Sequence, residues 1–367
     1  MTEYREATPD ELAGWDDLTV RPAGGHILQS RAWAEHRAKK GWQPRYLVGD
    51  DDSGVLALLR RWPLVGGASA YLPRGPVPTG GIDDAVARLD GASRWLVARG
   101  VDVIASDAEV PAHGYAERIA RIGYRPIEEI QPSRHRLSLR LGAHPDENAA
   151  LDNVSKSTRQ RIRQAERDGL SIVRHDPAAA TGAQRPGAYD DVLAPAESIE
   201  IALGRFHDLA TQTADRRHFV LGSRASFLDW TTRAFAAGHL VLLLAVENGA
   251  EAAPVAGLML YRHGGRLSTA LSGDSPDARS RHPGAFHLLR WRAIQLAIRE
   301  AAIEMDLGGV DVAGARREPR EADPMYGLYQ HKRSFGAEWV ELPGAHERVI
   351  RPWRYLAGRI AARAVRR

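Results

Sequence analysis

The sequence predicts an α/β protein built from two tandem units, each with a mixed and mostly antiparallel β-sheet. Three observations predict this class. The chain has 367 residues, which is more than one hydrophobic core usually organises. Pro and Gly divide it into short segments of alternating helical and strand character. Each half then repeats one order of segments, in which helices precede a strand meander, a long helix and a further strand.

The first unit is expected to span residues 1–144. Its helical segments carry apolar residues every three or four positions, and its strand segments are apolar or alternate with polar residues. Helices are predicted at 10–15, 31–40, 83–99 and 115–122. Strands are predicted at 45–49, 55–64, 68–72, 101–106 and 134–141.

The second unit is expected to span residues 145–344. It opens with a highly charged helix, 148–168, which Gly169 closes as a C-cap would. Further helices are predicted at 198–214, 224–237, 283–302 and 325–334, and strands at 170–173, 239–247, 255–261, 266–271, 303–307 and 339–342. Segment 177–195 has low complexity and is predicted to be a surface loop. Residues 345–367 are expected to form an arginine-rich helix that packs back toward the first unit.

Composition excludes several classes of site. The chain has no cysteine, so disulfides, thiol nucleophiles and cysteine-based zinc sites are excluded. Its 14 histidines show no H-E-x-x-H spacing, so no metal site is expected. The polar, acidic N-terminus lacks the layout of a secretory signal, and the longest apolar runs are only of strand length. A cytoplasmic protein is expected, with peripheral membrane contact left open.

Five segments resemble, in order and spacing, motifs of the FemABX family, the tRNA-dependent peptidoglycan aminoacyl- and peptidyltransferases. They are LQSRAWAEHRAKKGWQP, YLPRGPV, SKSTRQRIRQAERDGL, MDLGGV and LYQHKRSFGAEWVELPG. The order of elements likewise resembles the GNAT acetyltransferase fold, used twice. The chain departs from the family pattern at His331, where the family usually has Phe, and at Ala108, where it often has Pro. The strand ending at 268–271 lacks the family's tyrosines, and the coiled-coil arm of some relatives is absent.

The resemblance implies transfer of Gly, Ala or Ser from aminoacyl-tRNA to an amine on the stem peptide of a peptidoglycan precursor. The acceptor is a nucleotide-linked or a lipid-linked precursor, and the enzyme is expected to be a monomer. Aminoacyl-tRNA is a co-substrate, and no separate cofactor is implied. The reaction is aminolysis of an ester, so the site must hold the amine near the carbonyl and stabilise the developing oxyanion.

Two residues are candidates for the chemistry. The resemblance makes Lys332 the family's functional lysine, whose positive charge would meet the aminoacyl carbonyl or the terminal phosphate. Composition alone would make it an ordinary exposed lysine. Asp107 follows the predicted strand 101–106 and could accept a proton from the attacking ammonium. Its alternative role is to cap a turn before Ala108.

A second set of residues is assigned to substrate binding. Arg37, within the motif that includes Trp33, could bind the diphosphate or carboxylate of the precursor, and Lys39 and Lys40 are further candidates for this contact. Basic residues on one helix often form only a solvated face. The remaining candidates by resemblance are Arg224, Gly308, Gly309 and Tyr329. A tight turn explains the glycine pair equally well.

Two arginine-rich faces are candidates for contact with a polyanion. The first contains Lys156, Arg159, Arg163 and Arg167, which line one face of a helix and are assigned to tRNA. The second, in the C-terminal tail, contains Arg351, Arg354, Arg359, Arg363, Arg366 and Arg367. An apolar stripe of Trp353, Leu356 and Ile360 accompanies the tail, which could meet tRNA or an anionic membrane. Either face could instead be merely solvated.

Two other functions compete with aminoacyl transfer. A CoA-dependent N-acyltransferase would share the fold. Residues 281–286, RHPGAF, are similar in sequence to the pyrophosphate-binding loop of that class. However, Phe286 stands where the loop needs a small residue, and Pro283 lacks the backbone N–H that would bind phosphate. A non-catalytic RNA- or membrane-binding protein is the other alternative. The DLGG and LY-x-x-K segments argue against it.

Overall fold

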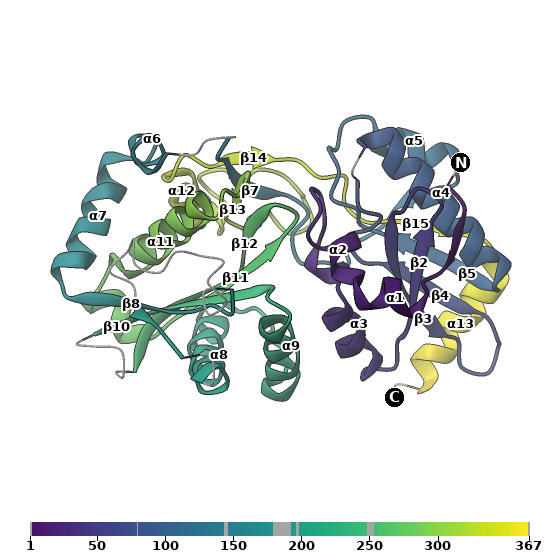
Figure 1. Cartoon of the computed structure of the whole chain (residues 1–367), viewed down its shortest axis with the longest axis horizontal. Coiled ribbons are helices and arrows are strands. Elements are labelled where there is room, and N and C mark those ends of the chain that lie inside the picture. The colour runs from purple at the N-terminus through teal and green to yellow at the C-terminus, as the bar shows by residue number, and fades with distance from the viewer. Residues whose placement is uncertain are drawn as a thin grey trace.

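The computed structural model describes residues 2–78, 80–142, 146–178, 192–195, 198–247 and 253–365. Two sheets lie side by side along the long axis of the molecule, each covered by helices (Figure 1). The predicted α/β class with two mixed, mostly antiparallel sheets is confirmed. Most of the predicted loop 177–195 lies outside the described residues.

The first sheet has seven strands. In spatial order they are β1 (Tyr4–Glu6), β2 (Gln43–Gly49), β3 (Gly54–Arg61), β4 (Ala68–Leu72), β5 (Val101–Ser106), β15 (His346–Val349) and β6 (Arg125–Pro126). The pair β4–β5 is parallel, and the other neighbours are antiparallel. The helical elements of this half are α1 (Pro9–Ala13), α2 (Trp15–Thr19), the 3-10 helix η1 (Ile27–Gln29), α3 (Arg31–Ala38), α4 (Ile82–Ala98) and α5 (Tyr115–Arg121).

The second sheet has eight strands. In spatial order they are β14 (Glu338–Val340), β7 (Arg136–Arg140), β13 (Glu304–Asp306), β12 (Arg266–Asp274), β11 (Pro254–His263), β10 (Leu240–Glu247), β8 (Leu170–His175) and β9 (Val192–Leu193). Its helices are α6 (Glu147–Asp152), α7 (Lys156–Arg167), α8 (Ile199–Arg217), α9 (Arg224–Ala236), α10 (Pro276–Arg281), α11 (Ala285–Arg299) and α12 (Tyr326–Arg333). A last helix, α13 (Pro352–Val365), follows β15.

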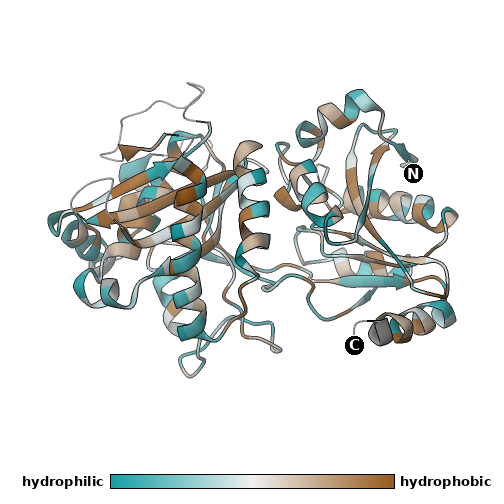
Figure 2. Ribbon diagram, turned by 90° about the horizontal axis from the view of Figure 1, so that it is seen from below, coloured by the Kyte–Doolittle hydropathy of each residue, from teal (hydrophilic) through white to brown (hydrophobic). Residues whose placement is uncertain are grey.

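Strand β10 illustrates why this sheet is buried on both faces. Its residues are apolar almost throughout, and side chains alternate between the faces of a strand. Val241, Leu243 and Ala245 enter the core that contains α7, α11 and α12. The intervening residues, Leu240, Leu242, Leu244 and Val246, enter the core under α8 and α9. Figure 2 shows the strands of this sheet mostly in the hydrophobic colour.

The two halves share a core. Ile27, Leu28 and Ala32, which precede or belong to α3, pack in the same cluster as Trp230 of α9. The indole rings of Trp33 and Trp230 meet edge to face, with their centres 4.9 Å apart. Nδ1 of His36 forms a hydrogen bond of 2.8 Å with Oδ2 of Asp229. Helices α3 and α9 therefore join the two halves through apolar and polar contacts together.

The structure corrects three sequence predictions. The strand expected at 134–141 as the end of the first unit is β7, and it pairs with β13 and β14 in the second sheet. The helix expected at 148–168 is two helices, because Ser155 caps a new start at α7 and accepts a hydrogen bond from the Thr158 N–H at 3.3 Å. The tail was expected to supply only a helix, but β15 also enters the first sheet beside β5.

Candidate active site

Lys332 lies near the end of α12, and its side chain is only 5% exposed. Its Nζ donates hydrogen bonds to the carbonyl oxygens of Gly308 and Gly309, at 2.9 and 3.0 Å. Burial, reinforced by the nearby charge of Arg290, lowers the pKa of Lys332 to about 7. The prediction from composition alone that Lys332 is exposed is therefore wrong. With this pKa, the amine changes charge near neutral pH.

The glycine pair forms the turn that receives this lysine. Gly308 has φ 84°, a left-handed conformation that glycine adopts without strain. Gly309 packs against Ser133, with which a Cβ at this position would overlap. Both residues are thus required by the local structure, and both present their carbonyl oxygens to Lys332.

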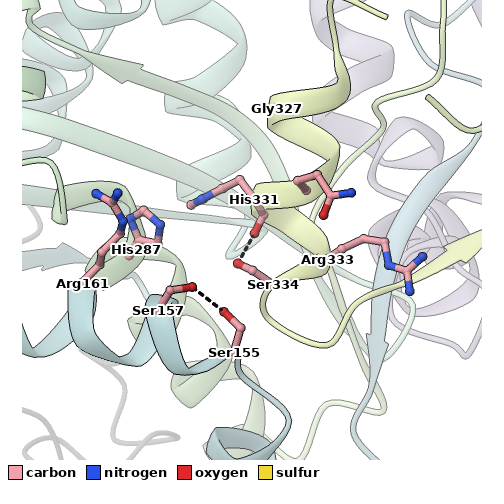
Figure 3. A pocket seen from close by; sticks show the side chains of 9 residues that line it. Ser155, Ser157, Arg161, His287, Gly327, His331, Arg333 and Ser334 are labelled. Carbon is pink, nitrogen blue, oxygen red and sulfur yellow. Dashed lines mark hydrogen bonds between the residues drawn. The ribbon is translucent and has the colours of Figure 1, made fainter. Parts of the chain in front are cut away.

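A cavity of about 820 Å³ lies beside α12. Its described lining comes from α7, α11 and α12 and from the residues next to them, and it contains no acidic side chain: Ser155, Ser157, Arg161, His287, Gly327, Gln330, His331, Arg333 and Ser334. In Figure 3 the side chains of Arg161 and His287 lie close together and face His331, whereas Arg333 points the other way.

Buried Arg290 lies directly behind the wall of this cavity. Its Nε is 3.3 Å from Nε2 of His331, and its Nη1 is 3.4 Å from the Leu307 carbonyl oxygen. No carboxylate among the described residues pairs with it in a salt bridge, and burial lowers its pKa to about 10. The guanidinium remains charged at neutral pH and adds to the positive potential of the cavity.

The two imidazoles of the cavity are neutral at physiological pH. Burial, followed by the charge of Arg290, lowers the pKa of His331 to about 2. Burial, followed by the charge of Arg161, lowers that of His287 to about 4. The described lining of the cavity therefore carries guanidinium charge without a carboxylate, and this combination suits phosphate groups.

Asp107 does not line this cavity. It is buried after β5, and its carboxylate accepts hydrogen bonds from the Tyr71 hydroxyl at 2.9 Å and from the Arg74 N–H at 2.7 Å. Burial raises its pKa. Arg74 in turn donates to the carbonyl oxygen of Ser133, which packs on Gly309. Asp107 is thus connected to the turn beneath Lys332 only through intermediate residues.

Arg37 occupies a different site, in the first half. Its guanidinium carbon lies 5.3 Å from the ring centre of Trp33 and 5.2 Å from that of Trp42. Its Nε is buried without a hydrogen-bond partner, as is Nε1 of Trp33. A second arginine, Arg60, also lies close to Trp42, with its guanidinium carbon 5.6 Å from the centre of the ring. The guanidinium of Arg37, with a buried and unpaired Nε between two indoles, is an arrangement that suits an anion.

The remaining predicted substrate residues are not gathered around either site. Arg224, at the start of α9, binds Asp208 and the Gly204 carbonyl oxygen on α8. Tyr329 is buried, and its hydroxyl donates a hydrogen bond to the Glu318 carboxylate. The same hydroxyl accepts a hydrogen bond from Arg333 at 2.9 Å. Both residues have partners within the fold, and neither appears in the described lining of the cavity.

The predicted tRNA face of α7 points largely to solvent. The helix buries Thr158, Ile162 and Ala165, and Lys156, Arg163 and Arg167 are exposed on the other side. Arg159 is partly buried and donates to the carbonyl oxygens of Leu151 and Asp152, which close α6. None of the four lines the cavity.

The sequence prediction missed Arg161, His287 and Arg290. Arg161 lies between the predicted arginines on a neighbouring side of α7, and it alone of that helix's arginines lines the cavity. The signal for Arg290 was a basic residue inside the apolar run FHLLRWRAIQLAI. In the described ranges, no group of three His, Asp or Glu side chains is arranged to hold a metal ion.

The chain resembles known proteins in both sequence and fold. Residues 153–333 match the family model of an acetyltransferase (GNAT) domain. A UDP-N-acetylmuramoylpentapeptide-lysine N(6)-alanyltransferase from Weissella viridescens is 24% identical over 180 residues, which is 45% of this chain and 52% of that protein. The match therefore spans about half the length of that relative.

The fold extends the comparison to the whole chain. The crystal structure of FemX superposes with a TM-score of 0.74 at 17% identity, covering 97% of this chain and all of that one. The C-terminal domain of a putative lysylphosphatidylglycerol synthetase from Agrobacterium fabrum superposes with a TM-score of 0.53 at 13% identity, over 97% and 96% of the chains. The predicted resemblance to the FemABX family is confirmed, and the chain is FemX-like in fold.

Proposed function

We propose that this chain transfers an aminoacyl group from tRNA to an amine on the stem peptide of a peptidoglycan precursor. The observation that carries the proposal is the placement of Lys332. Its amine is buried between two glycine carbonyls and is not itself part of the described cavity lining. Its neighbours in α12, His331 and Arg333, do line the cavity, whose described lining is basic and lacks acids. The name of the Weissella relative supports alanine as the transferred residue and the side chain of a stem lysine as the acceptor.

The cavity would bind the 3′ end of the aminoacyl-tRNA. Its terminal phosphates would meet Arg161, and their charge would also raise the pKa of Lys332 from about 7, so that the lysine is an ammonium in the complex. An ammonium has three N–H donors. Two are held by the carbonyls of Gly308 and Gly309, which leaves one for the substrate.

That third N–H would stabilise the oxyanion of the tetrahedral intermediate. The attacking amine forms the new C–N bond, and the bond from the carbonyl carbon to the ribose oxygen breaks. The proton lost by the amine neutralises the departing ribose oxygen, so atoms and charge balance. Asp107 serves this scheme as a positioning residue, because its hydrogen bonds hold the loop of Arg74 against Ser133.

The site of Arg37 would hold the acceptor. A half-buried guanidinium between Trp33 and Trp42 presents donors to a phosphate or carboxylate in a partly apolar setting. A nucleotide- or lipid-linked precursor carries a diphosphate, so both forms fit this site.

A CoA-dependent N-acyltransferase is the second candidate, favoured by the match of residues 153–333 to a GNAT domain. In that class a loop before a helix cradles the pyrophosphate with backbone N–H groups. Here the equivalent turn ends at Gly284, where a Cβ would overlap with the carbonyl oxygen of Arg161. Helix α7 thus covers the start of α11. Its Arg161 carbonyl oxygen lies where the phosphates of CoA would bind in that class.

Reconstitution distinguishes the candidates. The full chain is incubated with alanyl-, seryl- or glycyl-tRNA and with a nucleotide-linked or lipid-linked pentapeptide precursor, and the product mass is measured. We expect addition of one residue, alanine most efficiently, and no acyl transfer from acetyl-CoA to the same precursor. Acetylation of a small amine by acetyl-CoA, with no product from charged tRNA, would favour the second candidate.

A further inference from the structure

The C-terminal helix α13 turns its apolar stripe away from the protein. The helix packs inward through Tyr355 and Gly358, both against Trp62 of the turn between β3 and β4. Trp353, Leu356 and Ile360 recur at helical spacing on the opposite side, and they are 85%, 53% and 60% exposed. A helix that only completes a fold buries such a stripe.

The neighbouring turn adds to the same exposed region. Trp62 begins this turn and packs on α13, and the turn continues through Leu64 and Val65. Leu64 is 94% exposed, and Val65 is also exposed. Figures 1 and 2 both place α13 at the outer edge of the first half, away from the second sheet.

A basic pocket borders α13. It has a volume of about 370 Å³, and its described lining includes four arginines and one acid: Arg45, Arg61, Arg99, Arg354 and Glu6. Glu6 lies 3.7 Å from Arg45, and Asp102 lies 3.6 Å from Arg354. Arg61 and Arg99 form no salt bridge within the described part of the chain. The pocket reaches α13 through Arg354, which directly follows the exposed Trp353 in the chain. Guanidinium groups together with exposed Trp and Leu side chains are typical of a surface that enters the headgroup layer of an anionic bilayer.

We propose that α13 and the β3–β4 turn dock this protein on the surface of an anionic lipid bilayer. Trp353, Leu356 and Ile360 would enter the interface, while Arg61 and Arg99 would contact lipid phosphates. The protein would lie on the membrane rather than cross it, since no described helix is long and apolar enough to span one. Binding of this kind is independent of the transfer reaction.

The test uses the full chain and vesicles of phosphatidylcholine with or without phosphatidylglycerol. We expect co-sedimentation with the anionic vesicles at least about tenfold stronger than with neutral ones, weakening as salt is added. Trp353→Ser combined with Leu356→Ser should lower the binding about tenfold or more. The matched control is Val220→Ser, which removes a 98% exposed apolar side chain from the other half. Arg61→Gln with Arg99→Gln should remove mainly the preference for anionic vesicles.

Thermal unfolding checks that each variant folds. Aminoacyl transfer to a soluble nucleotide-linked precursor should stay unchanged in the variant that combines Trp353→Ser with Leu356→Ser. Several outcomes would overturn the proposal: equal vesicle binding by the variant and the wild type, no binding to anionic vesicles, or a dimer that Trp353→Ser dissolves. Loss of tRNA binding in the Arg61 and Arg99 variant with vesicle binding intact would assign the surface to RNA instead. Failure of aminoacyl transfer would leave the vesicle result unaffected.

Discussion

Nζ of Lys332 lies 2.9 Å from the carbonyl oxygen of Gly308, which is the second residue after β13. This bond, together with the one to Gly309, ties α12 to the turn on which it packs. A lysine at this position therefore has a structural task as well as the proposed chemical one. Experiments on this site must separate the two.

Replacing Lys332 with Met tests the chemistry. The substitution keeps the apolar stem and removes the donor, so single-turnover transfer from charged tRNA should fall about two to three orders of magnitude, as it does when an oxyanion donor is lost. It also leaves two buried carbonyls without their partner, at a cost of about 1–3 kcal/mol each at most. Thermal unfolding measures that cost, and the rate is compared at temperatures where both proteins are folded. A folded variant that transfers within a fewfold of wild type would contradict the proposed role.

The pH dependence of stability reports the charge of Lys332 directly. Its pKa is about 7 in the folded chain against a usual value of 10.5, so between these values the unfolded chain binds the proton and the folded chain does not. Stability must then rise with pH across this window. Wild type should gain stability relative to Lys332→Met as pH rises from 7 to 10, measured by denaturant unfolding. A difference that stays constant would mean that the lysine titrates normally.

Arg161 and Arg163 form a matched pair for tRNA binding. They are two residues apart on α7 and both are exposed, but only Arg161 lines the cavity. Arg161→Gln should weaken binding of aminoacyl-tRNA several-fold and reduce the slope of its salt dependence by about one counterion. Arg163→Gln should have a smaller effect on both. If Arg163 has the larger effect, the solvent-facing row predicted from the sequence is the RNA contact and the cavity is not.

Arg37→Gln tests the acceptor site. The substitution removes the charge that Trp33 and Trp42 enclose, so KM for the precursor should rise about tenfold with kcat changed little, as expected when binding is lost equally in the ground and transition states. The control is Arg31→Gln on the same helix, where the guanidinium already pairs with Glu35 at the surface. A matching rise in KM for both variants would show that the helix merely supplies general positive charge.

Much of this fold follows from local patterns. The continuous apolar run of β10, the Gly169 boundary and the spacing in α11 are each local features of one element, so the sequence alone predicted the α/β class and most segments. The family motifs likewise singled out Lys332 and the glycine pair. These features depend on residues close together in the chain.

Tertiary structure decided what those residues face. Strand β7 joined the second sheet and β15 the first, because pairing of strands distant in sequence is set by the whole sheet and not by the strand itself. The burial of Lys332 required α12 to pack on the turn after β13, and this packing changed an ordinary ammonium into a group that titrates near 7. Helix packing also explains why Arg161 and not Arg163 lines the cavity. The spacing along a helix fixes the direction of each arginine relative to the others, but the packing of α7 decides which of these directions faces the cavity.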